Sequence, residues 1–141
     1  MDENKVYSIY DKFGIEENEL IIKQFKDIIN DSTSSDEIKS KAYCGIGDLI
    51  IFFDPHSYDD AGYRYYRKAL EYDDNNLDAR VGICIIFDKY PSPVNNIISE
   101  KEYLENLDIL INNFDVIDDE DKKKNIIQLI KNLIKYRLKN I

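Results

Sequence analysis

The chain has 141 residues, which is enough for one domain with a buried core. It carries 28 Asp and Glu against 19 Lys and Arg, for a formal net charge of −9. This acidic balance argues against binding to nucleic acids or to anionic membranes, both of which need clustered basic side chains. A basic peptide, or a basic face on another protein, is an electrostatically easier partner.

The first residues are polar, and no apolar run approaches the ~20 residues of a membrane-spanning helix. We therefore expect a cytoplasmic protein. The two cysteines, Cys44 and Cys84, lie in apolar stretches rather than in a metal-ligand cluster. Reduced, buried thiols are expected there, and a disulfide between the two is the alternative.

Apolar residues recur at helical spacing along the chain, so the expected fold class is all-α, with six or seven helices and no sheet. The first two helices carry apolar stripes over residues 6–13 and 20–29, with Gly14 as a helix end between them. A third helix should start near Ser35, because Ser34 and Glu37 have the spacing of a capping box.

The remaining helices follow at short intervals. The fourth is expected over about residues 58–72, and the fifth over 77–89, ended by Pro91 and Pro93. Ser99, with Glu three residues later, is typical of the start of a sixth helix.

The acidic run 118–121 suits the N-terminus of a last helix, where the helix dipole favours negative charge. Lysines and an arginine gather in the second half of that helix, again in agreement with the dipole. No long linker interrupts the chain, so we expect a single domain over residues 1–141.

Two short segments echo each other. Residues 42–47 read Ala-Tyr-Cys-Gly-Ile-Gly and residues 79–84 read Ala-Arg-Val-Gly-Ile-Cys, at an offset of 79 − 42 = 37 residues. A period in the thirties is typical of stacked helix pairs.

The stretch from Ala42 to Phe87 resembles the tetratricopeptide repeat family, whose unit is a helix–turn–helix with small residues at close helix crossings. Gly47, Gly62 and Ala69 match small positions of that unit. The best unit spans residues 42–76, a partial second unit spans 77–114, and residues 118–141 would form a C-terminal capping helix.

Some positions depart from the family pattern. Arg80 stands where an aromatic residue is usual, and Cys84 stands where Gly or Ala is usual. The turn between the two helices of the best unit is also longer than in the family.

The resemblance implies a right-handed superhelix of antiparallel helix pairs, whose first helices line a concave groove. It also implies a non-catalytic adapter or scaffold that binds a peptide or a partner helix in this groove. The positions that face the groove carry over to Lys41, Cys44, Asp48, Phe52, Asp78, Val81, Ile85 and Lys89.

The family's carboxylate clamp needs polar donors, and Cys44, Asp48, Val81 and Ile85 occupy most of its positions. A mixed apolar and acidic groove better suits a hydrophobic segment that carries positive charge. Two alternatives stay open: these residues pack against a neighbouring helix, or the repeat surface serves self-association of a structural subunit into a homo-oligomer.

We expect no catalytic residues, metal site or cofactor. His56 lies beside Asp54 and Ser57, but neighbours on one turn rarely reach the geometry of a catalytic triad. The pair Asp59-Asp60 and the run 118–121 lack the alternating oxygen ligands and glycine of a calcium loop.

The fourth helix is rich in tyrosine and basic residues. Tyr66 is expected in the core, with Arg64, Arg67 and Lys68 on the opposite face. Because the whole chain is acidic, a protein-contact patch is favoured there over a nucleic-acid site.

Overall fold

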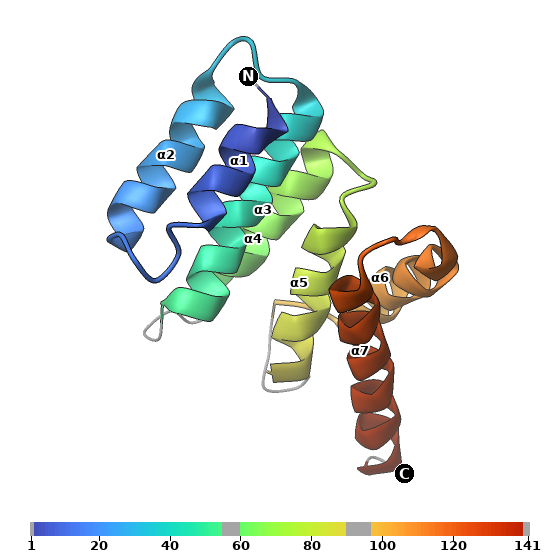
Figure 1. Ribbon diagram of the computed structural model, residues 1–141. Coiled ribbons are helices and arrows are strands. Elements are labelled where there is room, and N and C mark those ends of the chain that lie inside the picture. The colour runs from blue at the N-terminus through green and yellow to red at the C-terminus, as the bar shows by residue number, and fades with distance from the viewer. Residues whose placement is uncertain (1, 55–59, 90–96, 140–141) are drawn as a thin grey trace. The chain divides into compact units, whose positions relative to one another are not determined.

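The computed structural model describes residues 2–54, 60–89 and 97–139. Within these ranges the chain forms seven α-helices, a short 3-10 helix and no strand, which confirms the all-α prediction (Figure 1). The chain groups into two compact units, Met1–Ala79 and Arg80–Ile141. The boundary falls inside one continuous helix, α5 (Leu77–Lys89), so the single domain expected from the sequence stays a prediction.

Four complete helices make up the first unit (Figure 1). They are α1 (Glu3–Tyr10), α2 (Asn18–Asn30), α3 (Asp36–Phe53) and α4 (Asp60–Tyr72). Its core is formed by aliphatic side chains with Phe25, which is fully buried. The helix α1 ends at Tyr10, earlier than the predicted end at Gly14, and Gly14 lies in the turn that follows with a φ of 75°, a conformation that glycine adopts without steric cost.

Contacts along α3 fix the directions of its neighbours. Lys41 of α3 pairs with Glu3 of α1, and Asp48 with Tyr10, both 38 residues apart, so α1 and α3 run parallel. Ser40 of α3 bonds to the carbonyl of Ala69, near the far end of α4, so α3 and α4 run antiparallel.

Small residues stand where α3 meets its neighbours, as the sequence predicts. A Cβ at Gly47 would lie 2.8 Å from the ring of Tyr66 on α4. A Cβ at Gly45 would lie 2.4 Å from the ring of Phe25 on α2. Both distances are shorter than real Cβ contacts, so the helix approaches require glycine at these two positions.

One helix cap differs from the predicted one, and another was not predicted. The helix α3 begins one residue later than the capping box implies: Ser35 Oγ accepts a hydrogen bond from the amide of Ile38. Ser34 instead donates to the carbonyl of Ile28 and joins α3 to the end of α2. Asn76, which the sequence did not single out, accepts a hydrogen bond from the amide of Ala79 at the start of α5.

The second unit holds most of α5 with α6 (Glu100–Asn112), the 3-10 helix η1 (Phe114–Val116) and α7 (Glu120–Lys139). Ser99 caps α6 as predicted, by accepting a hydrogen bond from the amide of Glu102. Asp119 caps α7 through hydrogen bonds from the amides of Asp121 and Lys122, which agrees with the expected role of the acidic run.

Cross-helix contacts set the packing of the second unit. Arg80 of α5 donates to Asn106 of α6, and Phe87 stacks on Tyr103, so these two helices are antiparallel. Arg137 near the end of α7 pairs with Glu100 at the start of α6, and Lys123 near the start of α7 lies over the ring of Phe114 just after α6, so this pair is antiparallel as well. None of the helices in the described part of the chain combines the length and hydropathy required of a membrane span.

Candidate functional site

Part of the predicted groove face on α3 lies against a neighbouring helix. Lys41 forms an ion pair with Glu3 of α1, and Cys44 is buried at 2 % exposure. Phe52 keeps 57 % of its surface exposed. Packing against a neighbouring helix, one of the alternatives left open by the sequence, therefore describes Lys41 and Cys44, whereas Phe52 is available to a partner.

Asp48, the remaining α3 residue of the predicted groove, is held between two phenols. Tyr10 of α1 donates a 2.6 Å hydrogen bond to Oδ2, and Tyr66 of α4 donates one of 2.6 Å to Oδ1. Burial, with a smaller contribution from Asp78, raises the pKa of Asp48 from 3.8 to about 6, and the two phenols oppose this shift. Burial also raises the pKa of both tyrosines, so they keep the protons that they donate. Asp48 thus links three helices of the first unit.

The other half of the predicted groove lies on α5. Asp78 and Lys89 are exposed, Ile85 is partly buried and Val81 is buried at 8 % exposure. Asp78 belongs to the first compact unit and the other three residues to the second. A partner-binding role for these positions stays a prediction.

Both cysteines are buried and neither forms a disulfide, as expected from the sequence. Cys84 donates a long hydrogen bond of 3.9 Å to the carbonyl of Tyr103, and burial raises the pKa of its thiol. These are the properties of structural cysteines. Among the described residues no group of three or more metal-ligating side chains gathers, and the predicted turn around His56 lies outside them.

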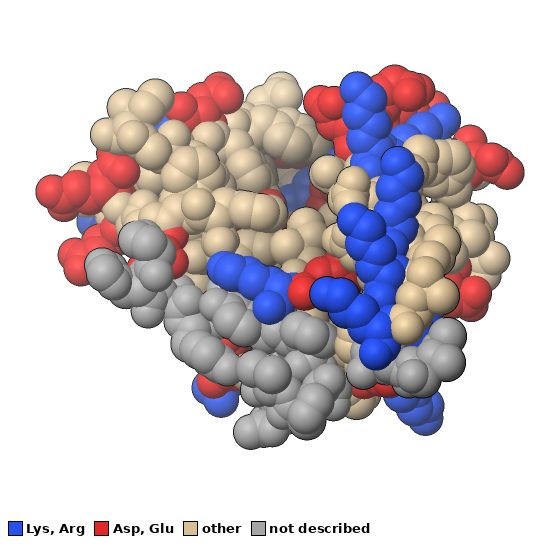
Figure 2. Space-filling model, turned by 90° about the horizontal axis from the view of Figure 1, so that it is seen from below, with Lys and Arg blue, Asp and Glu red and all other residues tan. Residues whose placement is uncertain are grey.

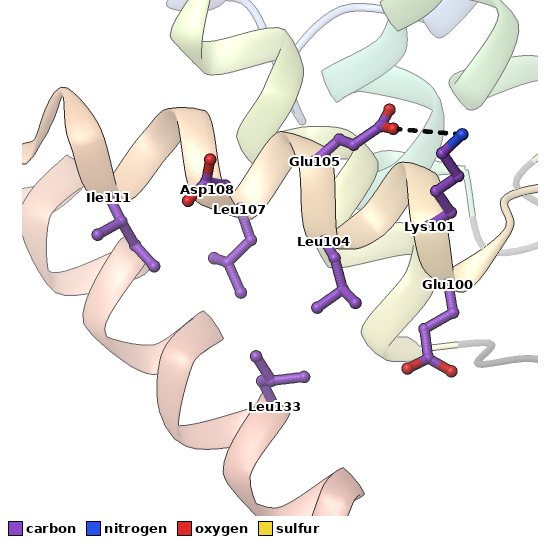
Figure 3. A pocket seen from close by; sticks show the side chains of 8 residues that line it. All are labelled: Glu100, Lys101, Leu104, Glu105, Leu107, Asp108, Ile111 and Leu133. Carbon is purple, nitrogen blue, oxygen red and sulfur yellow. Dashed lines mark ion pairs between the residues drawn. The ribbon is translucent and has the colours of Figure 1, made fainter.

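A groove that the sequence reasoning missed lies in the second unit, beside α6. It has a volume of 710 Å³. Leu104, Leu107 and Ile111 of α6 point toward Leu133 of α7 and form its apolar wall (Figure 3). Leu107 is buried at 2 % exposure, whereas Ile111 is 46 % exposed, so the groove has a packed floor and an open side.

Acidic side chains accompany this apolar wall. Glu100, Glu105 and Asp108 line the groove, against a single lysine, Lys101, which pairs with Glu105 at 3.9 Å (Figure 3). Arg137 of α7 pairs with Glu100 at 3.1 Å. Asp108 has no ion pair among the residues that the structure describes and accepts a 3.5 Å hydrogen bond from Asn112. We call the groove that these eight residues line the α6–α7 groove.

The sequence does contain a signal for this groove. The apolar residues of α6 include both Tyr103 and Leu104, and both Leu110 and Ile111. Adjacent apolar residues on a helix point in different directions, so α6 is apolar over more than the one face that a core requires. Tyr103 and Leu110 are buried at 1 % and 0 % exposure, and the other two line the groove.

The tyrosine-rich helix α4 behaves as predicted. Tyr66 is fully buried, and Arg64, Arg67 and Lys68 are exposed. A second hollow, of 460 Å³, lies between α3 and α4 and is lined by Tyr43, Asp60, Ala61, Arg64, Tyr65 and Lys68. Since Arg64 pairs with Asp60, this hollow has a less one-sided charge than the α6–α7 groove.

Comparison of the chain with protein-family models, with curated proteins and with solved structures finds no match. The resemblance to tetratricopeptide repeats therefore stays a prediction from the residues that carry it.

Proposed function

We propose that this protein is a non-catalytic protein-interaction module that binds an apolar, positively charged helix or peptide in the α6–α7 groove. The observation that carries the proposal is the combination, in one groove, of a leucine and isoleucine wall with three carboxylates. The partner chemistry is the one expected from the sequence, apolar and basic, but the surface that would bind the partner is a different one.

The spacing of the wall residues suits a helical partner. Leu104, Leu107 and Ile111 follow the i, i+3, i+7 pattern that groove-binding helices use for their anchors. Each leucine-sized side chain that a partner buried against them would contribute about 1.5–3 kcal/mol. The volume of 710 Å³ lies within the range of about 300–1,000 Å³ typical of ligand sites.

The carboxylates would select the charge of the partner. Asp108 has no ion pair among the described residues, and Glu105 has only a long contact to Lys101. A lysine or arginine on the partner would find these carboxylates beside the apolar wall, and an acidic partner would be repelled. Such rim charges affect association rate and specificity more than final affinity.

The repeat-like arrangement of the first unit supports a binding scaffold. The parallel helices α1 and α3 are offset by 38 residues, close to the offset of 37 between the echoed segments in α3 and α5. A tetratricopeptide-like superhelix requires helices that recur at such a period and pack in parallel. We therefore also propose this architecture for the chain.

A second candidate function is self-association, and one feature of α7 favours it. Ile127, Ile134 and Leu138 are 43 %, 54 % and 65 % exposed and lie on one stripe of the helix. Exposed Lys131 and Lys135 stand beside them. Figure 2 shows Lys and Arg side chains gathered in a band. The α7 helix of a second copy would therefore offer the apolar and basic chemistry that the α6–α7 groove suits.

The test of the first candidate uses synthetic peptides. A fluorescently labelled amphipathic helix of leucine and lysine should bind the protein saturably, and a leucine–glutamate peptide of the same pattern should not. The variant Leu104→Asp should lose binding, because a carboxylate then stands in the apolar wall. Ile15→Asp, a substitution at an 81 % exposed residue of the first unit, is the matched control and should bind normally.

Circular dichroism would first establish that both variants fold. Equal binding of the two peptides would refute the role of the carboxylates, and unchanged binding to folded Leu104→Asp would refute the groove. Sedimentation of the protein without peptide tests the second candidate function, self-association. A dimer would favour it if the substitutions Leu104→Asp and Leu138→Asp each dissociate that dimer.

A further inference from the structure

A separate cavity in the second unit combines aromatic and polar walls. It measures 250 Å³ and is lined by residues of three helices: Phe87 and Asp88 of α5, Tyr103 of α6, and Asn132 and Tyr136 of α7. None of these residues lines the α6–α7 groove. The cavity is smaller than the roughly 300–1,000 Å³ of sites for drug-sized ligands, so its contents must be small.

Aromatic rings make up three of the five lining side chains. Phe87 stacks on Tyr103 with ring centroids 4.3 Å apart, and Tyr136 meets Phe87 edge-on at 6.1 Å. Phe87 and Tyr103 are each 1 % exposed, so packing holds these two rings in place. Tyr136 is the partly exposed member of the three.

The carboxylate of Asp88 lies among these rings without a cation. It accepts a 2.9 Å hydrogen bond from the side-chain amide of Asn132, and it has no ion pair in the described ranges. Burial raises the pKa of Asp88, and the neighbouring Asn132 and Tyr103 oppose the shift. A half-buried carboxylate that only neutral groups stabilise is a site where a cation would be strongly favoured.

The hydroxyl of Tyr103 is the second polar group that bears on the cavity. It is buried and, although it lies near Asp88, has no hydrogen bond of normal geometry to any described residue. Such a buried hydroxyl costs free energy unless a water or a ligand oxygen satisfies it. The cavity thus offers a site for a positive charge and a donor for an oxygen acceptor.

We propose that this cavity binds a small organic ammonium ion that also carries an oxygen, an amino alcohol of the size of choline. Asp88 pairs with the ammonium group, Tyr136 and Phe87 contact its alkyl groups, and the Tyr103 hydroxyl donates to its oxygen. Aromatic side chains around a carboxylate are a recurring way to recognise ammonium groups, because the ring faces attract cations. This site is independent of the partner proposed for the α6–α7 groove.

The test compares two ligands of the same shape. Choline and its neutral isostere 3,3-dimethylbutan-1-ol are titrated into the full chain and followed by NMR at the resonances of Tyr103 and Tyr136. We expect saturable binding of choline, with the isostere weaker by about tenfold or more, since it lacks the charge that Asp88 pairs with. Absence of saturable choline binding, or equal binding of the isostere, would overturn the proposal.

Two substitutions then locate the site. Asp88→Asn should weaken choline about tenfold while leaving the isostere unchanged, and Tyr136→Leu should weaken both. Asp108→Asn, on the α6–α7 groove, is the matched control and should bind choline like the unsubstituted chain. Equal affinity of folded Asp88→Asn for choline would contradict the assignment, and if that variant does not fold, the two-ligand comparison still decides.

Discussion

Replacing Asp48 by Asn should remove a pH dependence of stability that this one carboxylate creates. In the folded chain, burial raises its pKa to about 6, against 3.8 for the ordinary group. Between these two values the unfolded chain has lost the proton and the folded chain still holds it. Folding stability from this residue is therefore greatest below pH 3.8 and is lost as the pH rises through about 6.

The magnitude follows from the size of the shift. Each pKa unit corresponds to about 1.4 kcal/mol, so raising the pKa from 3.8 to about 6 costs the ionised form about 3 kcal/mol. The asparagine side chain of the variant has no proton to lose but keeps an oxygen for Tyr10 or Tyr66. The difference in unfolding free energy between the original chain and Asp48→Asn should change by up to about 3 kcal/mol between about pH 4 and pH 7, in favour of the variant at pH 7.

Urea unfolding of both chains across this range measures the difference, since effects of the other carboxylates are common to both. Asp27→Asn, a substitution at an exposed residue of α2, is the matched control. A difference that stays constant over the whole range would refute the account of Asp48 as a buried, desolvated carboxylate.

The remaining predictions concern packing, capping and thiol chemistry. Gly47→Ala should destabilise the chain by about 1–3 kcal/mol in urea unfolding, because its Cβ would stand 2.8 Å from the Tyr66 ring; an unchanged midpoint would contradict the close crossing. Ser99→Ala should cost about 1 kcal/mol through loss of the α6 cap, measured by thermal unfolding, and no loss would argue against that cap. Cys44 and Cys84 should react with a thiol reagent only at the rate of unfolding; fast labelling of the native chain would contradict their burial.

Much of the helical framework could be predicted because its signals are local. Ser99 and its partner amide, for example, lie only three residues apart. Which of Ser34 and Ser35 caps α3 was harder to predict from the sequence. Both are serines before the same helix, and the choice depends on the contact of Ser34 with Ile28 on the preceding helix.

The candidate site was harder to predict because it depends on long-range contacts. The resemblance to tetratricopeptide repeats placed Asp48 on a groove face, but Tyr10 and Tyr66, 38 and 18 residues away in the chain, hold it among three helices. The α6–α7 groove forms only because Leu133 approaches Leu104. No sequence pattern near either residue predicts that contact. The excess of apolar residues on α6 indicates a second apolar face on this helix, but it does not indicate which element or partner covers that face.

The most direct test of the central claim is a titration of the methyl-labelled chain with the leucine–lysine peptide, followed by NMR. We expect saturable shifts of the Leu104, Leu107, Ile111 and Leu133 methyl groups with this peptide, and none with the leucine–glutamate peptide. Shifts spread evenly over the molecule, or confined to the first unit, would contradict the assignment of the α6–α7 groove as the partner-binding site.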